Sequence, residues 1–270
     1  LLLLGDWIMS LSLHVFFLAM PDYLGYESVV GMAGNPELLP VVEKALKFKR
    51  LGNDMSVVLT GHEIQNRTSV VGGFTAVPEG TSLQKLKERM PAAKEFALET
   101  THLANKIVNI PPYLDLVRKC EHVALKEETQ YGLLTGQLIS TEGLNVPEGA
   151  YPEWLIEQHV PGCNSKHAVI KGRDSFLVGP LARVNLNFDY LSPDARAIAR
   201  EVGFEVPCFN PYMSIVARAI ELVHAIDASM EIIQAIGEPK YEEPRYSVRA
   251  GTGYAVTEAP RGICCHGGRI

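Results

Sequence analysis

Residues 211–237 restrict the fold more than any other part of the chain. Apolar side chains recur there at spacings of three and four, which is the period of one face of an α-helix. This face consists of Ile215, Ala219, Leu222, Ile226, Met230 and Ile233, and it is widened by Val216, Ile220 and Val223. A helix that is apolar around most of its circumference must be covered on most sides. We therefore predict that this helix lies at the centre of a helical bundle.

Local signals predict three further helices. Their ranges are 35–59, 81–108 and 192–203. Asn35 and Ser192 are suitable N-cap residues, and each is followed by a proline that fits the first helical turn. Thr81 and Gln84 have the spacing of a capping box for the second helix.

Strand-like segments also occur, with β-branched and aromatic residues alternating with small ones. They cover residues 68–77, 131–140, 176–186 and 246–256. Residues 144–151, in contrast, are predicted as an irregular loop, and residues 251–255 as a turn. The mixture of a long-helix bundle and a smaller β-sheet region predicts the α+β fold class. We assign residues 1–270 to one such domain.

The apolar run over residues 1–20 raises the question of a membrane span or signal peptide. It contains Asp6 and His14, lacks a basic leading region and a small-residue cleavage site, and ends at Pro21 and Asp22. A buried core helix explains these features better, so we predict no membrane span. The sequence begins without methionine, which favours a truncated chain.

Composition and charge exclude several functions. With 270 residues, 47% hydrophobic, the chain can bury a full core. A net charge of −6 with dispersed basic residues argues against nucleic acid as a partner. The five cysteines are Cys120, Cys163, Cys208, Cys264 and Cys265. Their odd number and irregular spacing argue against a disulfide framework and favour a reducing, cytoplasmic setting. No second cysteine or histidine pair supports a zinc site at the vicinal thiols, so we assign no metal ligand.

Four segments, taken in order, resemble the large subunit of soluble nickel-iron hydrogenases. They are the apolar residues 1–22 ending in Pro-Asp, residues 64–74 ending in Val-Gly-Gly-Phe, residues 175–185 with Val-Gly-Pro-Leu-Ala-Arg, and residues 258–262, Glu-Ala-Pro-Arg-Gly. That family binds its metal pair through two Cys-x-x-Cys motifs, and this sequence contains none. The chain therefore resembles a central fragment of such a subunit. The resemblance implies a nickel-iron centre in the intact family protein, with none bound by this chain alone.

The resemblance also assigns roles to individual residues. Arg261 corresponds to the arginine that hangs over the open side of the metals, and Asp22 to the aspartate that steadies it. We therefore expect these two side chains to form a pair. His14 and His266 correspond to histidines that surround the metals. Leu11 stands where another histidine is expected, and Gln65-Asn66 stands where the family has His-Pro, so part of this polar surround is altered.

The function implied by the resemblance is an oxidoreductase that cleaves or forms dihydrogen. Electrons would pass through an iron-sulfur small subunit to NAD(P), a deazaflavin or ferredoxin, and Arg261 would act as the base that receives the proton. The isolated chain is expected to be inactive. Two alternatives stay open. A quinone-site subunit of the respiratory complex I type is disfavoured by the retained Ala-Pro-Arg-Gly, whereas a metal-free scaffold that binds a small subunit is favoured by Leu11 and Gln65.

Overall fold

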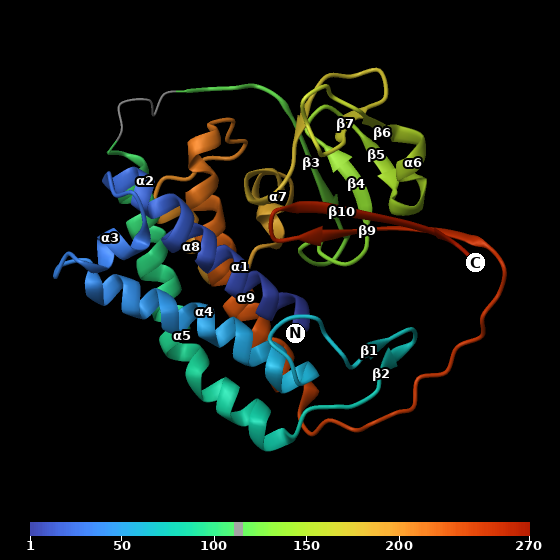
Figure 1. Cartoon of the computed structure of the whole chain (residues 1–270), viewed down its shortest axis with the longest axis horizontal. Coiled ribbons are helices and arrows are strands. Elements are labelled where there is room, and N and C mark those ends of the chain that lie inside the picture. The colour runs from blue at the N-terminus through green and yellow to red at the C-terminus, as the bar shows by residue number, and fades with distance from the viewer. Residues whose placement is uncertain (111–115) are drawn as a thin grey trace. The chain divides into compact units, whose positions relative to one another are not determined.

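The computed structural model describes residues 1–110 and 116–270 (Figure 1). The chain forms two compact units. Within the described ranges, the first, mainly helical unit comprises residues 1–110, 192–204 and 215–248, and the second comprises residues 116–191, 205–214 and 249–270. Helices dominate the first unit and small sheets the second, which confirms the α+β class.

The helical unit begins with one apolar helical stretch. It consists of α1 (Leu2–Leu13), the π-helical segment η1 (His14–Ala19) and α2 (Met20–Leu24). Trp7, Ile8 and Leu11 are buried, as predicted for a core helix. By length and composition the stretch Leu2–Leu24 could also cross a membrane, a test that core helices of soluble proteins meet as well.

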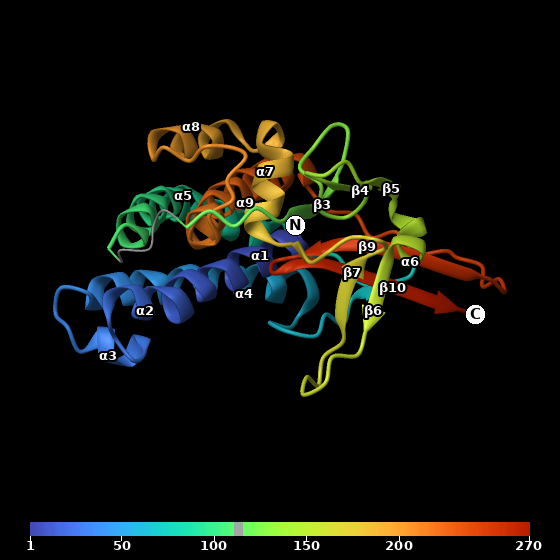
Figure 2. The same cartoon turned by 90° about the horizontal axis from the view of Figure 1, so that it is seen from above.

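Helix α4 (Leu39–Thr60) lies alongside α1 in both views (Figures 1 and 2). Gly52 makes this approach possible, because a Cβ atom there would lie 2.5 Å from the carbonyl oxygen of Gly5 and 2.6 Å from the amide nitrogen of Met9. The helix starts later than predicted. Asn35 instead caps a turn, in which its Oδ1 accepts from the Glu37 amide at 2.9 Å.

The remaining helices of this unit are α3 (Val29–Ala33), α5 (Gly80–Val108), α8 (Pro193–Glu201) and α9 (Ser214–Ile236). Ser192 caps α8 as predicted, with its Oγ accepting from the Ala195 amide at 3.3 Å. The capping box predicted at Thr81 and Gln84 is wrong, because α5 begins at Gly80 and has no side-chain cap bond. A short hairpin of β1 (Ser69–Val70) and β2 (Gly73–Phe74) precedes α5.

Helix α9 confirms the main prediction from the sequence. Its apolar face is buried, and the predicted core residues Ile215, Leu222, Ile226 and Ile233 are each at most 5% exposed. A single 3-10 turn, η4 (Pro211–Met213), precedes it, so the α-helix itself starts at Ser214.

The second unit is built around a four-stranded sheet of order β5-β4-β3-β8. These strands are β3 (Glu121–Lys126), β4 (Gln137–Ser140), β5 (Asn145–Pro147) and β8 (Phe176–Leu177). Two hairpins accompany the sheet, β6 (Leu155–Gln158) with β7 (His167–Ile170) and β9 (Thr252–Ala259) with β10 (Gly262–Arg269). Short helical segments complete this unit: η2 (Glu148–Ala150), α6 (Tyr151–Trp154), α7 (Pro180–Asn187) and η3 (Phe188–Tyr190). Val123, Leu125, Leu138 and Val256 belong to its buried core.

Three predictions for this unit are wrong. The strand predicted over residues 176–186 ends at Leu177, because Gly179 turns the chain at φ 96° and Pro180 starts helix α7. Residues 144–151 contain β5 and helical turns where a loop was predicted. The turn predicted at residues 251–255 is wrong, because Thr252 to Ala255 belong to β9 and pair with β10.

Candidate functional site

The Ala-Pro-Arg-Gly segment lies at the turn of the β9–β10 hairpin. Ala259 pairs with Gly262, which leaves Pro260 and Arg261 as the two turn residues. Glu258 and Pro260 are buried whereas Arg261 is exposed, as the alternation of a strand end requires. The backbone therefore presents the Arg261 side chain outward from a buried base.

Arg183 of helix α7 fixes this turn by hydrogen bonds to its backbone. Its side chain is fully buried, and its Nη1 donates to Oε2 of Glu258 at 2.9 Å and to the carbonyl oxygen of Ala259 at 3.0 Å. Its Nη2 donates to the carbonyl oxygen of Pro260 at 2.8 Å. We call Arg183, Glu258 and these two carbonyls the arginine clamp. A planar guanidinium with several fixed donors suits this task, since it can bind a carboxylate and two carbonyls together.

Glu258 connects the arginine clamp to the sheet. Its Oε1 accepts from the backbone amide of Leu125 in β3 at 3.0 Å, and its own amide donates to the carbonyl oxygen of Leu133 at 2.7 Å. Asn187, at the end of α7, donates to the carbonyl oxygen of Leu125 at 2.9 Å. The buried carboxylate is thus paired with a cation and hydrogen-bonded, the condition under which a charge is tolerated inside a protein.

Two glycines let the two motif segments touch. A Cβ at Gly179 would lie 2.7 Å from the carbonyl oxygen of Arg261, and a Cβ at Gly262 would lie 2.5 Å from Cγ2 of Val178. Both distances are far below normal carbon contacts, so any other residue would push the segments apart. The glycines of Val-Gly-Pro and Arg-Gly therefore serve one contact between the two motifs.

The predicted site residues divide between the units. Arg261 and His266 lie on the β9–β10 hairpin, where Nε2 of His266 is 3.1 Å from Sγ of Cys264. Asp22 is exposed on α2, and His14 is partly exposed at the start of η1, eight residues earlier on the same helical stretch. The pairing of Asp22 with Arg261 stays a prediction.

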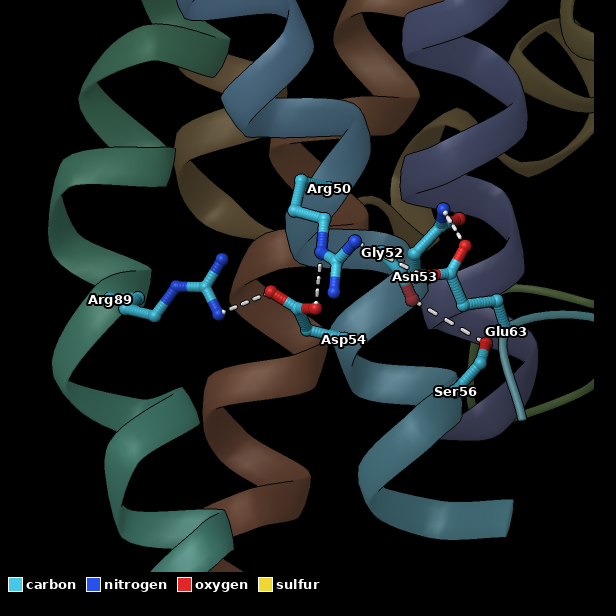
Figure 3. Close-up of polar contacts among 7 residues, drawn as sticks. All are labelled: Arg50, Gly52, Asn53, Asp54, Ser56, Glu63 and Arg89. Carbon is cyan, nitrogen blue, oxygen red and sulfur yellow. Dashed lines mark hydrogen bonds and ion pairs between the residues drawn. The ribbon is translucent and has the colours of Figure 1, made fainter. Parts of the chain in front are cut away.

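The segment after α4, which carries Gln65 and Asn66, is anchored by a polar network (Figure 3). Glu63 contacts Nη1 of Arg50 at 3.1 Å and accepts from Nδ2 of Asn53 at 2.9 Å. Asp54 joins the network to α5, since it bonds Nε of Arg50 at 2.7 Å and Nη1 of Arg89 at 2.8 Å (Figure 3). Gln65 itself is exposed and adopts φ 59°. Glu63 fixes where this segment leaves α4.

The side chains that the structure describes do not fit a nickel-iron pair. Within residues 1–110 and 116–270, no three histidine, cysteine or acidic side chains gather at metal-binding distance. The described residues include two Cys–His pairs, Cys163 with His167 at 3.3 Å and Cys264 with His266 at 3.1 Å. Burial raises the pKa of the Cys265 thiol to about 11, so this sulfur is protonated at neutral pH.

Sequence reasoning quoted Arg183 and Glu258 within the motifs but gave them no role. The sequence does contain a signal for Arg183, which is a single charged residue within an apolar run. This run is buried in the structure, and a buried charge requires a partner. His122, Asn185 and Cys208 were likewise missed as a hydrogen-bonded group. Their contacts join three distant segments, which no local pattern shows.

The chain has relatives among hydrogenase subunits. No family model matches the chain. It is 31% identical to sulfhydrogenase 1 subunit alpha of Pyrococcus furiosus over 97% of this chain, and 28% identical to sulfhydrogenase 2 subunit alpha of the same organism over its whole length. The chain spans 60% and 62% of the lengths of these two relatives. It is thus homologous to hydrogenase alpha (large) subunits.

The chain shares its fold with solved hydrogenase structures. An NAD+-reducing [NiFe]-hydrogenase in the H2-reduced state superimposes with a TM-score of 0.87 at 20% identity, covering all of this chain and 64% of that one. A [NiFeSe] hydrogenase of Desulfovibrio vulgaris Hildenborough gives a TM-score of 0.75 at 19% identity, covering all of this chain and 67% of that one. The α+β fold with a long-helix bundle is therefore that of hydrogenase large subunits.

Proposed function

We propose that this chain forms the arginine-bearing part of a hydrogenase large subunit, an oxidoreductase that cleaves or forms dihydrogen. The proposal rests on the arginine clamp. In it, a fully buried ion pair fixes the backbone next to Arg261. A protein gains little stability from such a pair compared with apolar residues of the same size. The presence of the ion pair at this turn is explained if the proposed reaction requires Arg261 at a fixed position.

The chemistry that suits Arg261 is proton handling. Heterolytic cleavage of dihydrogen yields a proton and a hydride, and the proton needs an acceptor held at a fixed place. We propose that Arg261 and Asp22 form this acid–base pair, with the carboxylate steadying the guanidinium through charge-assisted hydrogen bonds. His14 and His266 would contribute to the polar surround of the reacting centre.

The metals and the electron partner belong to the proposal as well. The described donor groups do not hold a metal pair, so cysteine ligands would have to come from polypeptide other than these 270 residues. Electrons would pass to an iron-sulfur small subunit, in a cytoplasmic complex, as the free cysteines favour. The 270 residues alone are expected to be inactive.

The test is dihydrogen–deuterium exchange by the assembled complex, purified with this subunit from its native source. Arg261→Lys keeps a cation but loses the fixed fork of donors, and we expect it to lower the exchange rate by about 100-fold, the order of a lost acid–base group. Arg269→Lys, on the same hairpin and exposed, should leave the rate unchanged. Full exchange by Arg261→Lys, or none by the unaltered complex, would overturn the proposal.

A metal-free scaffold is the second candidate. The substitution of Leu11 and Gln65-Asn66 where family histidines are expected, with no gathered donor set among the described residues, favours it. A complex that contains this subunit, binds its partner and holds no nickel would establish this alternative.

A further inference from the structure

The second unit contains a small cavity whose lining includes no residue of the β9–β10 hairpin. Its volume is ≈ 260 Å³, below the ~300–1,000 Å³ of pockets for drug-sized ligands, so its ligand must be small. Apolar side chains supply most of its wall, chiefly Phe176, Leu177, Leu181 and Phe209. The polar part of the lining comes from Arg118, Cys120, His122 and Ser175.

His122 supplies one fixed hydrogen-bond donor to this cavity. Asn185 is oriented by the backbone of Cys208, because its Oδ1 accepts from the Cys208 amide at 2.8 Å and its Nδ2 donates to the Cys208 carbonyl at 2.7 Å. The same Nδ2 lies 2.8 Å from Nδ1 of His122, which must therefore accept. The neutral ring then carries its hydrogen on Nε2, and burial keeps it neutral by lowering the pKa of His122.

Arg118 supplies a positive charge at the same cavity. It is exposed, makes no ion pair within the described part of the chain, and is held in place by its amide, which donates to the Phe209 carbonyl at 3.1 Å. Burial raises the pKa of the Cys120 thiol, and the charge of Arg118 opposes this rise. The residues that line this cavity include no carboxylate, whereas Glu142 and Asp174 line an adjoining pocket that Arg118 also borders.

We propose that this cavity binds a small carboxylate with an apolar body. The carboxylate would accept from Nε2–H of His122 and pair with the guanidinium of Arg118, while the apolar body would contact Phe176, Leu181 and Phe209. Inorganic anions lack the apolar body and would leave this wall uncovered. The site is independent of the dihydrogen chemistry proposed for Arg261.

Cys120 allows the proposal to be tested on the full chain, because it lines the cavity and can be alkylated. Phenylacetate is the probe, and phenylacetamide is its uncharged match in shape. We expect phenylacetate to slow N-ethylmaleimide labelling of Cys120, measured by peptide mass spectrometry, at about tenfold lower concentration than phenylacetamide, the equivalent of one charge-assisted contact. Labelling of Cys163, outside the cavity lining, should not change.

Two variants distinguish carboxylate binding in the cavity from a general effect of surface charge. Arg118→Gln should abolish the preference for phenylacetate over phenylacetamide. Lys119→Gln removes the adjacent exposed cation, which does not line the cavity, and should retain the preference. The proposal is overturned if phenylacetate gives no protection of Cys120, if both probes protect equally in the unaltered chain, or if Arg118→Gln retains the preference.

Discussion

At the scale of single residues, the second unit depends on buried charges that are fully matched. Arg183 and Glu258 are each at most 1% exposed, and the hydrogen bonds of their side chains reach α7, β3 and β9. Such a pair contributes little compared with an apolar replacement of both partners, but removing one partner leaves an uncompensated buried charge. The two residues should therefore behave as one unit in mutagenesis.

Arg183→Met should lower the free energy of unfolding by about 3–5 kcal/mol, because Glu258 would remain buried without its cation. Urea unfolding followed by circular dichroism measures this loss. The double variant Arg183→Met/Glu258→Met should recover part of it. The exposed control Arg269→Met should change stability by less than about 0.5 kcal/mol. A loss below about 1 kcal/mol for Arg183→Met would show that the arginine clamp is dispensable.

The vicinal cysteines provide a second test at this scale. Cys265 packs against the core of the second unit, and burial raises its pKa to about 11, whereas Cys264 faces His266 at 3.1 Å. The thiolate is the reactive form, so at pH 8 iodoacetamide should label Cys264 and leave Cys265 largely unmodified. Labelling of Cys265 should rise about tenfold per pH unit up to pH about 11, as measured by mass spectrometry. Equal rates at pH 8 would contradict the burial of Cys265.

At the scale of elements, the long helices could be predicted, whereas several strands, β3 among them, could not. The spacing in α9 spans many turns, so its period is unambiguous. β3, in contrast, is six residues long and nearly all buried, so it lacks the alternation that would distinguish it from a helix. The arginine clamp joins residues 75 apart, and the cavity joins His122 of β3 to Phe209 beyond α7, so neither site could be inferred from local sequence.

The contact of α1 with α4 gives a prediction for this scale. Gly52→Ala should destabilise the chain by about 1–3 kcal/mol, because the new methyl group would meet the backbone of α1 at Gly5 and Met9. Thermal unfolding measures the effect. Gly80→Ala is the matched control, since nothing lies within 4 Å of its added Cβ at the start of α5. Similar stabilities of the two variants would show that α1 and α4 adjust freely.

At the scale of the whole molecule, the resemblance of ordered motifs predicted the fold that the structure has. Homology to hydrogenase alpha subunits and the TM-score of 0.87 confirm it. The site roles stay predictions, because they depend on where the two units lie in an assembled enzyme. These are the roles of Arg261, Asp22, His14 and His266. Composition and periodicity specify helices and cores, whereas such a site depends on the arrangement of separate parts.

Elemental analysis tests the metal question for the molecule as a whole. The purified chain of 270 residues should contain far less than one nickel per chain, because its described histidines, cysteines and acids do not gather into a donor set. Any residual nickel should disappear in the Cys264→Ser/His266→Ala variant, which removes the closest Cys–His pair. About one tightly bound nickel per chain would show that these side chains converge after all.

The arginine clamp grips the main chain of Ala259 and Pro260, and it makes no demand on the side chain that follows. The geometry of position 261 is therefore set by its neighbours, and evolution could exchange the group displayed there without rebuilding the scaffold. A chain that lost its original catalytic activity would keep a rigid backbone at position 261, on which another reactive side chain could be placed. For the same reason, a spectroscopic label placed at this position would report on its surroundings with little motion of its own attachment.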